Sequence, residues 1–99
     1  MYIHNSQGFE WDEDKNAYNK AKHGLDFQEA LDFEWESAVF LDRSRSKDKE
    51  TRYIAVNFFK GKLHTIVFTR RENLTRLISM RRSNAREEKD YEKANIETS

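Results

Sequence analysis

The sequence predicts an α+β domain with a small antiparallel sheet of three to four strands, two helices before the sheet and one helix after it. Helix start and stop signals bracket residues 12–24, and a second helix start follows at Asp26. From residue 38 to 81 the apolar positions instead follow a period of two, which is typical of strands. The chain has 99 residues, a length that suits one domain.

The first elements are a short strand and a helix. Residues 9–11 alternate apolar and polar side chains, which predicts an edge strand. Asp12 is a suitable N-cap with acidic residues behind it, and Gly24 supplies a left-handed stop, so a helix is predicted as far as His23. This helix has a weak apolar face of Ala17, Tyr18 and Ala21.

A second helix is predicted from Asp26, which has capping-box spacing to Glu29. Phe33 and Trp35 fall near its end and are expected to fold back under the sheet. Its apolar face at helical spacing consists of Phe27, Ala30 and Leu31.

The predicted strands cover residues 38–41, 52–59, 63–69 and 74–81. An exposed polar loop is expected at 42–49, a tight turn at Lys60-Gly61 and another turn at 71–73, so the last three strands form an antiparallel meander. The helices are expected over one sheet face. Among the strand aromatics, Tyr53 is a candidate to face a base or a partner, and the expected core residues are Phe58, Phe59 and Phe68.

The last predicted helix starts near Ser83 or Asn84, and Asn84 has capping-box spacing to Glu87. Its mostly charged surface suggests that it packs lightly or awaits a partner. We therefore expect an N-terminal extension at 1–8, the domain at 9–94 and a frayed end at 95–99.

Composition excludes several classes of protein. The absence of Cys excludes disulfides and thiolate zinc sites, and no apolar run approaches the roughly 18 residues of a membrane span. The N-terminus lacks the pattern of a secretory signal, so a cytoplasmic location is expected. Three His at scattered positions match no metal-ligand spacing, and the sequence predicts neither a metal nor another cofactor.

The balanced charge hides an asymmetry. Residues 1–37 hold three basic and nine acidic side chains, whereas residues 38–99 hold fifteen basic and nine acidic ones. Two interpretations stay open: one side of the fold faces an anion, or the two halves pair with each other.

A candidate phosphate site lies in the basic half, where Arg52, Arg71, Arg76 and Arg81 fall on adjacent predicted strands. Guanidinium groups match phosphate oxygens and keep their charge. With Glu50 or His23 as acid or base, these are the ingredients of metal-free RNA cleavage. Alternatively, His23 only complements the helix dipole, Glu50 only pairs with a cation, and the arginine stems only cover apolar neighbours.

The segment FEWDEDKNAYNKAKHGLDFQEAL contains, in this order, Phe-Glu-Trp-Asp, a Lys, Lys-His-Gly and Glu-Ala. In this order of motifs the chain resembles the BrnT-type toxins. Glu13 stands where the family usually has Pro, and Met80 where it has a small residue. The later matching positions are Glu50, Arg52, Tyr53, Thr69, Arg71, Arg76, Leu77, Ile78, Ser79, Arg81, Arg86, Glu87, Tyr91 and Glu92.

The resemblance implies a RelE-like fold and the toxin half of a bacterial type II toxin–antitoxin pair. It further implies metal-independent RNA cleavage that stops translation, and a DNA-binding antitoxin of the BrnA type that blocks the toxin and represses the shared operon. DNA would then be contacted only through the antitoxin complex, membranes would play no part, and a homodimer is a possible state.

The sequence thus yields a hypothesis with named residues. Candidate catalytic residues are His23, Glu50, Arg52, Arg71 and Arg81. Candidate RNA-binding residues are Lys22, Arg70, Arg76, Arg82 and Arg86. One alternative is a non-catalytic module that binds nucleic acid or the antitoxin and acts in operon autoregulation. Another is a structural partner subunit whose charged last helix is covered by its partner.

Overall fold

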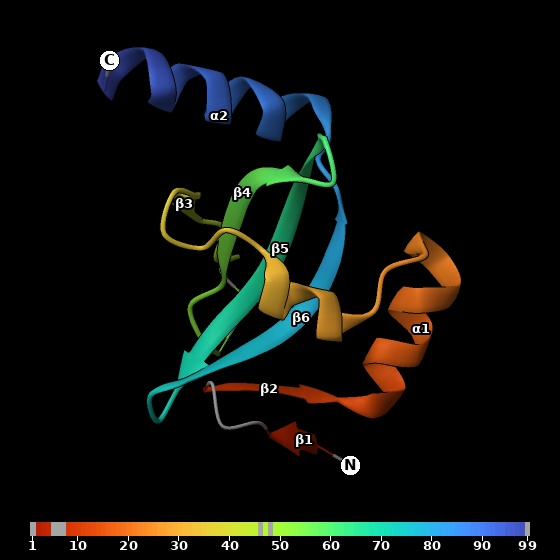
Figure 1. Cartoon of the computed structure of the whole chain (residues 1–99). Coiled ribbons are helices and arrows are strands. Elements are labelled where there is room, and N and C mark those ends of the chain that lie inside the picture. The colour runs from red at the N-terminus through yellow and green to blue at the C-terminus, as the bar shows by residue number, and fades with distance from the viewer. Residues whose placement is uncertain (1, 5–7, 46, 48, 99) are drawn as a thin grey trace.

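The computed structural model describes residues 2–4, 8–45, 47 and 49–98. It confirms the α+β class and shows a six-stranded sheet in the order β1-β2-β6-β5-β4-β3 (Figure 1). The strands are β1 (Tyr2–His4), β2 (Phe9–Asp12), β3 (Val39–Asp42), β4 (Tyr53–Phe59), β5 (Lys62–Arg71) and β6 (Leu74–Arg82). The helices are α1 (Glu13–His23), the 3-10 helix η1 (Phe27–Asp32) and α2 (Ala85–Thr98).

The prediction of three to four strands in an antiparallel sheet was wrong in two respects. Strands β1 and β2 extend the sheet, and β2 runs parallel to β6 through the pairs Phe9–Thr75 and Glu10–Arg76, so the sheet is mixed. Strand β2 is also not the edge strand that was predicted, because β1 pairs antiparallel along its other side. Sequence periodicity reports a strand's faces but not the strands beside it.

The predicted antiparallel meander of β4, β5 and β6 is confirmed. Both of its turns place two successive residues at positive φ, Lys60 (53°) with Gly61 (84°) and Glu72 (51°) with Asn73 (69°). Positive φ at both central positions is the requirement of the hairpin turn whose twist matches that of the strands. The register between β5 and β6 shifts between Val67 and Phe68, where β6 has one extra residue, Ile78, as in a β-bulge.

Helix α1 begins and ends where the sequence predicted. The Asp12 carboxylate accepts a hydrogen bond of 2.8 Å from the Asp14 backbone N–H, and Gly24 ends the helix at φ 72°. The predicted apolar face was wrong, because its three residues, Ala17, Tyr18 and Ala21, are exposed. Helix α1 buries a carboxamide instead.

That carboxamide belongs to Asn19, which is 3% exposed. Its side-chain N–H2 donates to the Met80 and Leu25 carbonyls, both at 2.9 Å, and its oxygen accepts from the Met80 N–H at 3.1 Å. Strand β2 covers the edge of β6 only at Thr75 and Arg76. Asn19 therefore acts as a neighbouring strand at Met80 and satisfies backbone groups that the sheet leaves open there.

The second helix has the predicted capping box between Asp26 and Glu29, but it is a six-residue 3-10 helix rather than an α-helix. Six residues is long for a 3-10 helix, since runs beyond about three or four residues are uncommon. The oxygen of the Asn16 side chain holds its first residue by accepting from the Phe27 N–H at 2.8 Å. As predicted, the chain then turns back under the sheet, with Phe33 buried and the Trp35 indole donating to the Ala30 carbonyl.

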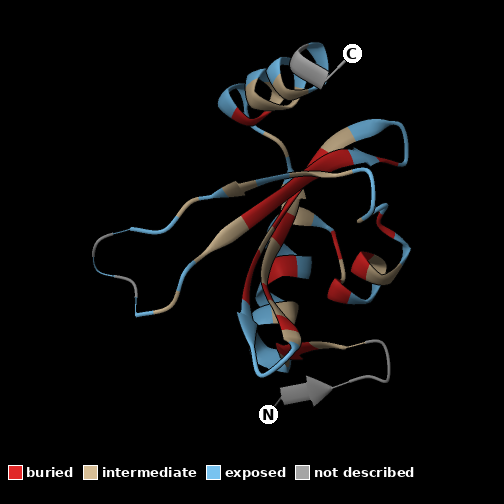
Figure 2. Ribbon diagram, turned by 90° about the vertical axis from the view of Figure 1, so that its left-hand side faces the viewer, coloured by how far each residue is buried: buried red, intermediate tan, exposed pale blue. Residues whose placement is uncertain are grey.

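The two faces of the sheet carry different helices, so the prediction of helices over one face was wrong. Helix η1 covers the face of Ala55, Ile66 and Met80, which forms the hydrophobic core. Helix α2 contacts Thr65 and Arg81, and their side chains point to the opposite face because strand residues alternate. Figure 2 shows that the buried residues follow the middle of the long strands.

Phe59 and Phe68 belong to the core as predicted, whereas Phe58 does not. Its ring is 53% exposed and contacts Tyr91 of α2 on the second face. Helix α2 begins after the predicted capping box of Asn84 and Glu87 and continues to Thr98, through most of the segment expected to fray. Within the described part of the chain, no helix is long and apolar enough to cross a membrane.

Replacing Asn19 with Ala tests the role of its carboxamide. We expect Asn19→Ala to lower the free energy of unfolding by about 3 kcal/mol, because it leaves the buried Met80 backbone groups without partners. Chemical denaturation monitored by circular dichroism measures this change. Asn95→Ala, at the exposed end of α2, is the control and should change stability by less than about 0.5 kcal/mol. An Asn19→Ala variant as stable as this control would contradict the assignment.

Candidate active site

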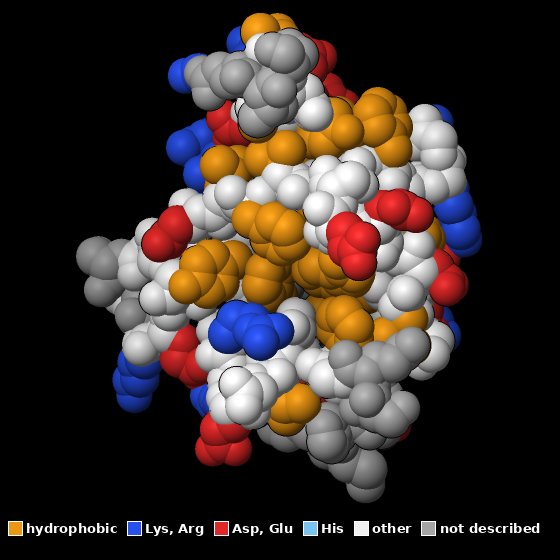
Figure 3. Space-filling model, turned by 60° about the vertical axis from the view of Figure 1, so that its left-hand side comes forward, with side chains coloured by type: hydrophobic (Ala, Val, Ile, Leu, Met, Phe, Trp, Pro, Cys, Tyr) orange, Lys and Arg blue, Asp and Glu red, His pale blue; other side chains and the backbone are white. Residues whose placement is uncertain are grey.

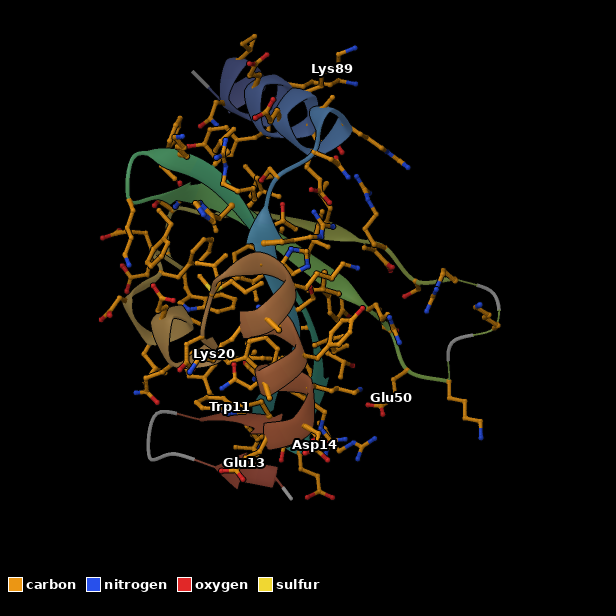
Figure 4. The ribbon with its side chains drawn as sticks, turned by 90° about the vertical axis from the view of Figure 1, so that its right-hand side faces the viewer. Trp11, Glu13, Asp14, Lys20, Glu50 and Lys89 are labelled. Carbon is orange, nitrogen blue, oxygen red and sulfur yellow. The ribbon has the colours of Figure 1, made fainter. Side chains whose placement is uncertain are left out.

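A polar pocket of about 220 Å³ lies between the start of α1 and the sheet. Glu50 and Arg52 come from the segment before β4, and Arg76 comes from β6. Figure 4 shows Glu50 on the same side of the molecule as Asp14 in the first turn of α1. The pocket is lined by Asp12, Lys15, Lys49, Glu50, Arg52, Thr69, Arg76, Leu77 and Ile78. Three of the predicted site residues therefore share one cavity.

A fourth predicted residue, Arg71, forms an ion pair with Glu50 across the end of β5. Its hydrogen bond is the main reason why the pKa of Glu50 is lower than usual, and the charge of Arg76 adds to the effect. Glu50 is therefore a carboxylate at neutral pH. The structure brings together Glu50, Arg52, Arg71 and Arg76.

Arg76 is held in place by Glu10, whose oxygen accepts a hydrogen bond of 2.9 Å from the Arg76 Nε. Both side chains are largely buried, with 17% of Arg76 and 11% of Glu10 exposed. The parallel pairing of β2 with β6 puts these two residues side by side. A buried, paired guanidinium has a fixed orientation, which suits the recognition of a phosphate in one geometry.

His23 and Lys22 lie in a second pocket beside the first, and the two pockets share Lys15 and Ile78. Burial lowers the pKa of His23 below its ordinary value of 6.5, and the positive charges of Lys22 and Arg81 lower it further. The imidazole is therefore neutral at pH 7 and is able to accept a proton. Because the pockets adjoin, His23 and Glu50 border one continuous surface.

Arg81 is near His23, but its guanidinium is bound by Glu87. The two nitrogens Nη1 and Nη2 donate to the two Glu87 oxygens at 2.7 and 2.9 Å. The Glu87 carboxylate, 5% exposed, also accepts from Thr65 and from the Asn84 N–H. This network fastens the start of α2 to β5 and β6.

The remaining predicted residues lie away from the pocket. Arg70 is exposed on the face of η1, where it donates to the Thr75 hydroxyl. Arg82 pairs in register with His64 on that same face, and Arg86 is exposed on α2. The predicted RNA-binding set is thus distributed over several surfaces rather than one.

Sequence reasoning did not select Lys15, Lys49 or Thr69 as site residues, yet all three line the first pocket. Lys15 follows the N-cap by three residues and is the Lys of the family motif, and these two features were the available signs that it belongs to the site. Met80, which differs from the family pattern, is fully buried in the core and does not line either pocket.

The charge asymmetry has a mixed structural basis. Glu10–Arg76 and Glu29–Lys60 join the acidic half to the basic half. Other pairs lie within the basic half, as Glu50–Arg71 and Glu87–Arg81 do. Pairing between the two halves is therefore confirmed in part, and the interpretation that one side faces an anion stays a prediction. In the described ranges, no three His, Cys, Asp or Glu residues lie close enough together to hold a metal ion.

This arrangement suits an anionic substrate. Guanidinium groups from Arg52 and Arg76 line the pocket, and an ionised carboxylate borders it. Such a set stabilises negative charge that develops on a phosphoryl group, and the carboxylate is a base for a nearby hydroxyl.

Comparisons with known proteins agree with this interpretation. Residues 11–87 match the family model described as the ribonuclease toxin BrnT of a type II toxin–antitoxin system. The crystal structure of the Brucella abortus ribonuclease toxin BrnT is similar to this chain, with a TM-score of 0.60 and 31% sequence identity. The match covers 75% of this chain and 92% of the Brucella chain. The search of curated proteins found no match.

The Glu87 network predicts a pH-dependent stability difference. Burial raises the pKa of Glu87, but the bonds from Arg81, Asn84 and Thr65 outweigh it and lower the pKa below its usual value. A lowered folded-state pKa contributes stability above about pH 4.3, the ordinary Glu value, and this stability disappears as pH falls through the folded-state pKa.

We therefore expect Glu87→Gln to lower the free energy of unfolding by about 2 kcal/mol at pH 7 and by much less at pH 3. Urea denaturation at both pH values measures the difference. Glu88→Gln, one residue further along α2, makes the same charge change outside the network and should have little effect. If Glu87→Gln lowers the free energy of unfolding equally at both pH values, the ionised Glu87 carboxylate is not what stabilises the network.

Proposed function

Because this chain belongs to the BrnT family of ribonuclease toxins of type II toxin–antitoxin systems, we propose that it cleaves RNA without a metal ion in the pocket of Glu50, Arg52 and Arg76. The observation that carries this proposal is the single cavity that these three residues line. A carboxylate and two guanidinium groups that line one cavity support the binding of a phosphate there.

In the proposed reaction, Glu50 accepts the proton of a ribose 2′-hydroxyl. The 2′ oxygen then forms a bond to the adjacent phosphorus, and the bond from phosphorus to the 5′ oxygen breaks. The products are a 2′,3′-cyclic phosphate and a 5′-hydroxyl end. Lys15, which lines the same pocket, supplies an ammonium group that donates a proton to the departing oxygen.

Arg52 and Arg76 stabilise the negative charge on the phosphoryl oxygens of the transition state. Glu10 orients Arg76, and Arg71 orients Glu50. The low pKa of Glu50 makes it a weaker base but keeps it ionised. His23 in the adjoining pocket is the second candidate for the base.

The other cations have supporting roles in this proposal. Arg81 contributes through its charge near His23 and holds α2 through Glu87. Further RNA phosphates contact the exposed side chains of Lys22, Arg70, Arg82 and Arg86.

RNA cleavage by this chain would stop translation, and its antitoxin would be a DNA-binding protein of the BrnA type that blocks the toxin and represses the operon. We also propose a relation to the RelE-type ribonuclease fold, as the sequence resemblance implied. A homodimer is the simplest oligomer consistent with this proposal.

Glu50→Gln tests the proposed base. We expect the parent protein to cleave total RNA in EDTA, and Glu50→Gln to cleave it about 100-fold more slowly, because the amide no longer accepts the proton. Gel analysis of RNA fragments and growth on induced expression measure the two effects. Glu88→Gln makes the same charge change on α2, outside both pockets and the groove, and should behave like the parent. A Glu50→Gln variant as active as this control would place the base elsewhere.

The pH dependence of kcat/KM distinguishes Glu50 from His23. With Glu50 as base, activity should persist down to about pH 4.3 and fall below it, because Arg71 lowers the pKa of Glu50. Arg71→Gln should move this fall to higher pH. With His23 as base, activity would instead fall at a pH below the ordinary histidine pKa of 6.5 but where Glu50 is still ionised, and Arg71→Gln would leave the position of the fall unchanged.

A further inference from the structure

A groove lined by aromatic rings lies on the sheet face opposite the proposed catalytic pocket. Its lining residues are Phe9, Trp35, Phe40, Tyr53, Phe68, Arg70 and Thr75. Figure 3 shows hydrophobic side chains gathered on this face, bordered by a Lys or Arg side chain and, elsewhere, by acidic side chains. The proposed cleavage chemistry does not use this surface.

The rings form an ordered array. Trp35 and Phe40 are stacked at 6.4 Å between ring centroids, with 24° between their planes. Phe68 stands nearly perpendicular to both, at 5.5 and 6.1 Å. The Trp35 indole N–H is fixed by the Ala30 carbonyl, and Phe40 is still 49% exposed. The array is held in place before any ligand binds.

The charges around the groove are unevenly distributed. Arg70 lies at its rim and is exposed, and the segment on either side of Trp35 carries Glu34 and Glu36. A flat apolar ligand with a negative group would place its ring on the aromatic side chains and its charge at Arg70. A nucleotide unit of single-stranded RNA has this combination of a flat base and a phosphate.

The groove and the catalytic pocket are at the same end of the sheet. Thr69 and Arg76 line the pocket, whereas their sequence neighbours Arg70 and Thr75 line the groove, because strand residues alternate between faces. The next residue, Arg71, points back toward Glu50. Successive arginines therefore follow the β5–β6 hairpin from one face to the other.

We propose that this aromatic groove, defined by the seven lining residues above, binds an unpaired base of the RNA substrate, with Arg70 on an adjacent phosphate. The RNA strand passes from the catalytic pocket around the β5–β6 hairpin to the groove. The inference rests on the proposed function, since it assigns a second contact to the same substrate.

Binding of a labelled, non-cleavable 2′-O-methyl oligonucleotide tests this proposal separately from cleavage. We expect Phe40→Ala and Arg70→Gln each to weaken binding about tenfold, in line with the contribution of one stacked base or one phosphate contact. Phe58→Ala is the matched control, because Phe58 is a similarly exposed ring on the other face. It should bind like the parent.

Replacing one base of the oligonucleotide by an abasic unit, position by position, separates stacking from charge. We expect one position at which the abasic unit weakens binding to the parent but not to Phe40→Ala. Circular dichroism of each variant establishes that it is folded. Trp35 fluorescence should also be quenched by the intact oligonucleotide in a Trp11→Phe background, where Trp35 is the only tryptophan.

The proposal is overturned if Phe40→Ala binds the oligonucleotide as tightly as Phe58→Ala, or if no oligonucleotide binds to the parent. It is also overturned if Phe40→Ala weakens binding of the antitoxin but not binding of the oligonucleotide. The groove beside the edge strand β3 would then be a protein interface. If the parent protein binds the oligonucleotide and Phe40→Ala weakens this binding, but the parent does not cleave RNA, the proposed function is contradicted and the groove assignment is supported.

Discussion

The buried carboxamide of Asn19 is the contact on which the arrangement of this domain depends. Strand β2 is too short to cover the edge of β6, and the Asn19 side chain takes its place at Met80. The same side chain binds the Leu25 carbonyl and so fixes the segment between α1 and η1. Since α1 has no buried apolar face, this polar contact determines where the helix lies relative to the sheet.

The position of α1 in turn determines the candidate site. Its first turn supplies Lys15 to the pocket proposed for catalysis, and its last turn places His23 in the adjoining pocket. Both pockets border Ile78, the extra residue of β6 at the register shift between β5 and β6. Because hydrogen bonds are directional, the Asn19 contacts fix the position of α1 along β6. Lys15 and His23, at the two ends of the helix, therefore have fixed positions relative to that strand.

Paired carboxylates hold the arginines around the site. Glu10 fixes Arg76 from β2, Glu50 contacts Arg71 at the end of β5, and Glu87 fastens Arg81 to α2. In each pair the carboxylate neutralises part of the positive charge of the arginine and fixes the orientation of its guanidinium group. This fits a site that recognises a phosphate in one geometry better than one that attracts any polyanion. The aromatic groove lies behind the same strand ends and offers uncharged, flat contacts instead.

The sequence by itself determined the local structure. Asp12, Gly24 and the two capping boxes set the helix starts and stops, and alternation set the meander, because these signals act within a few residues. The sequence also predicted Glu50 and Arg52 as catalytic residues and Arg76 as an RNA-binding residue, and the structure brings these three into one pocket. Only the tertiary structure decided that β2 pairs parallel to β6, that the helices cover opposite faces, and that Lys15 joins the pocket. Those features depend on contacts between residues far apart in the sequence, such as Glu10 and Arg76 at a separation of 66 positions, and local patterns carry no information about such contacts.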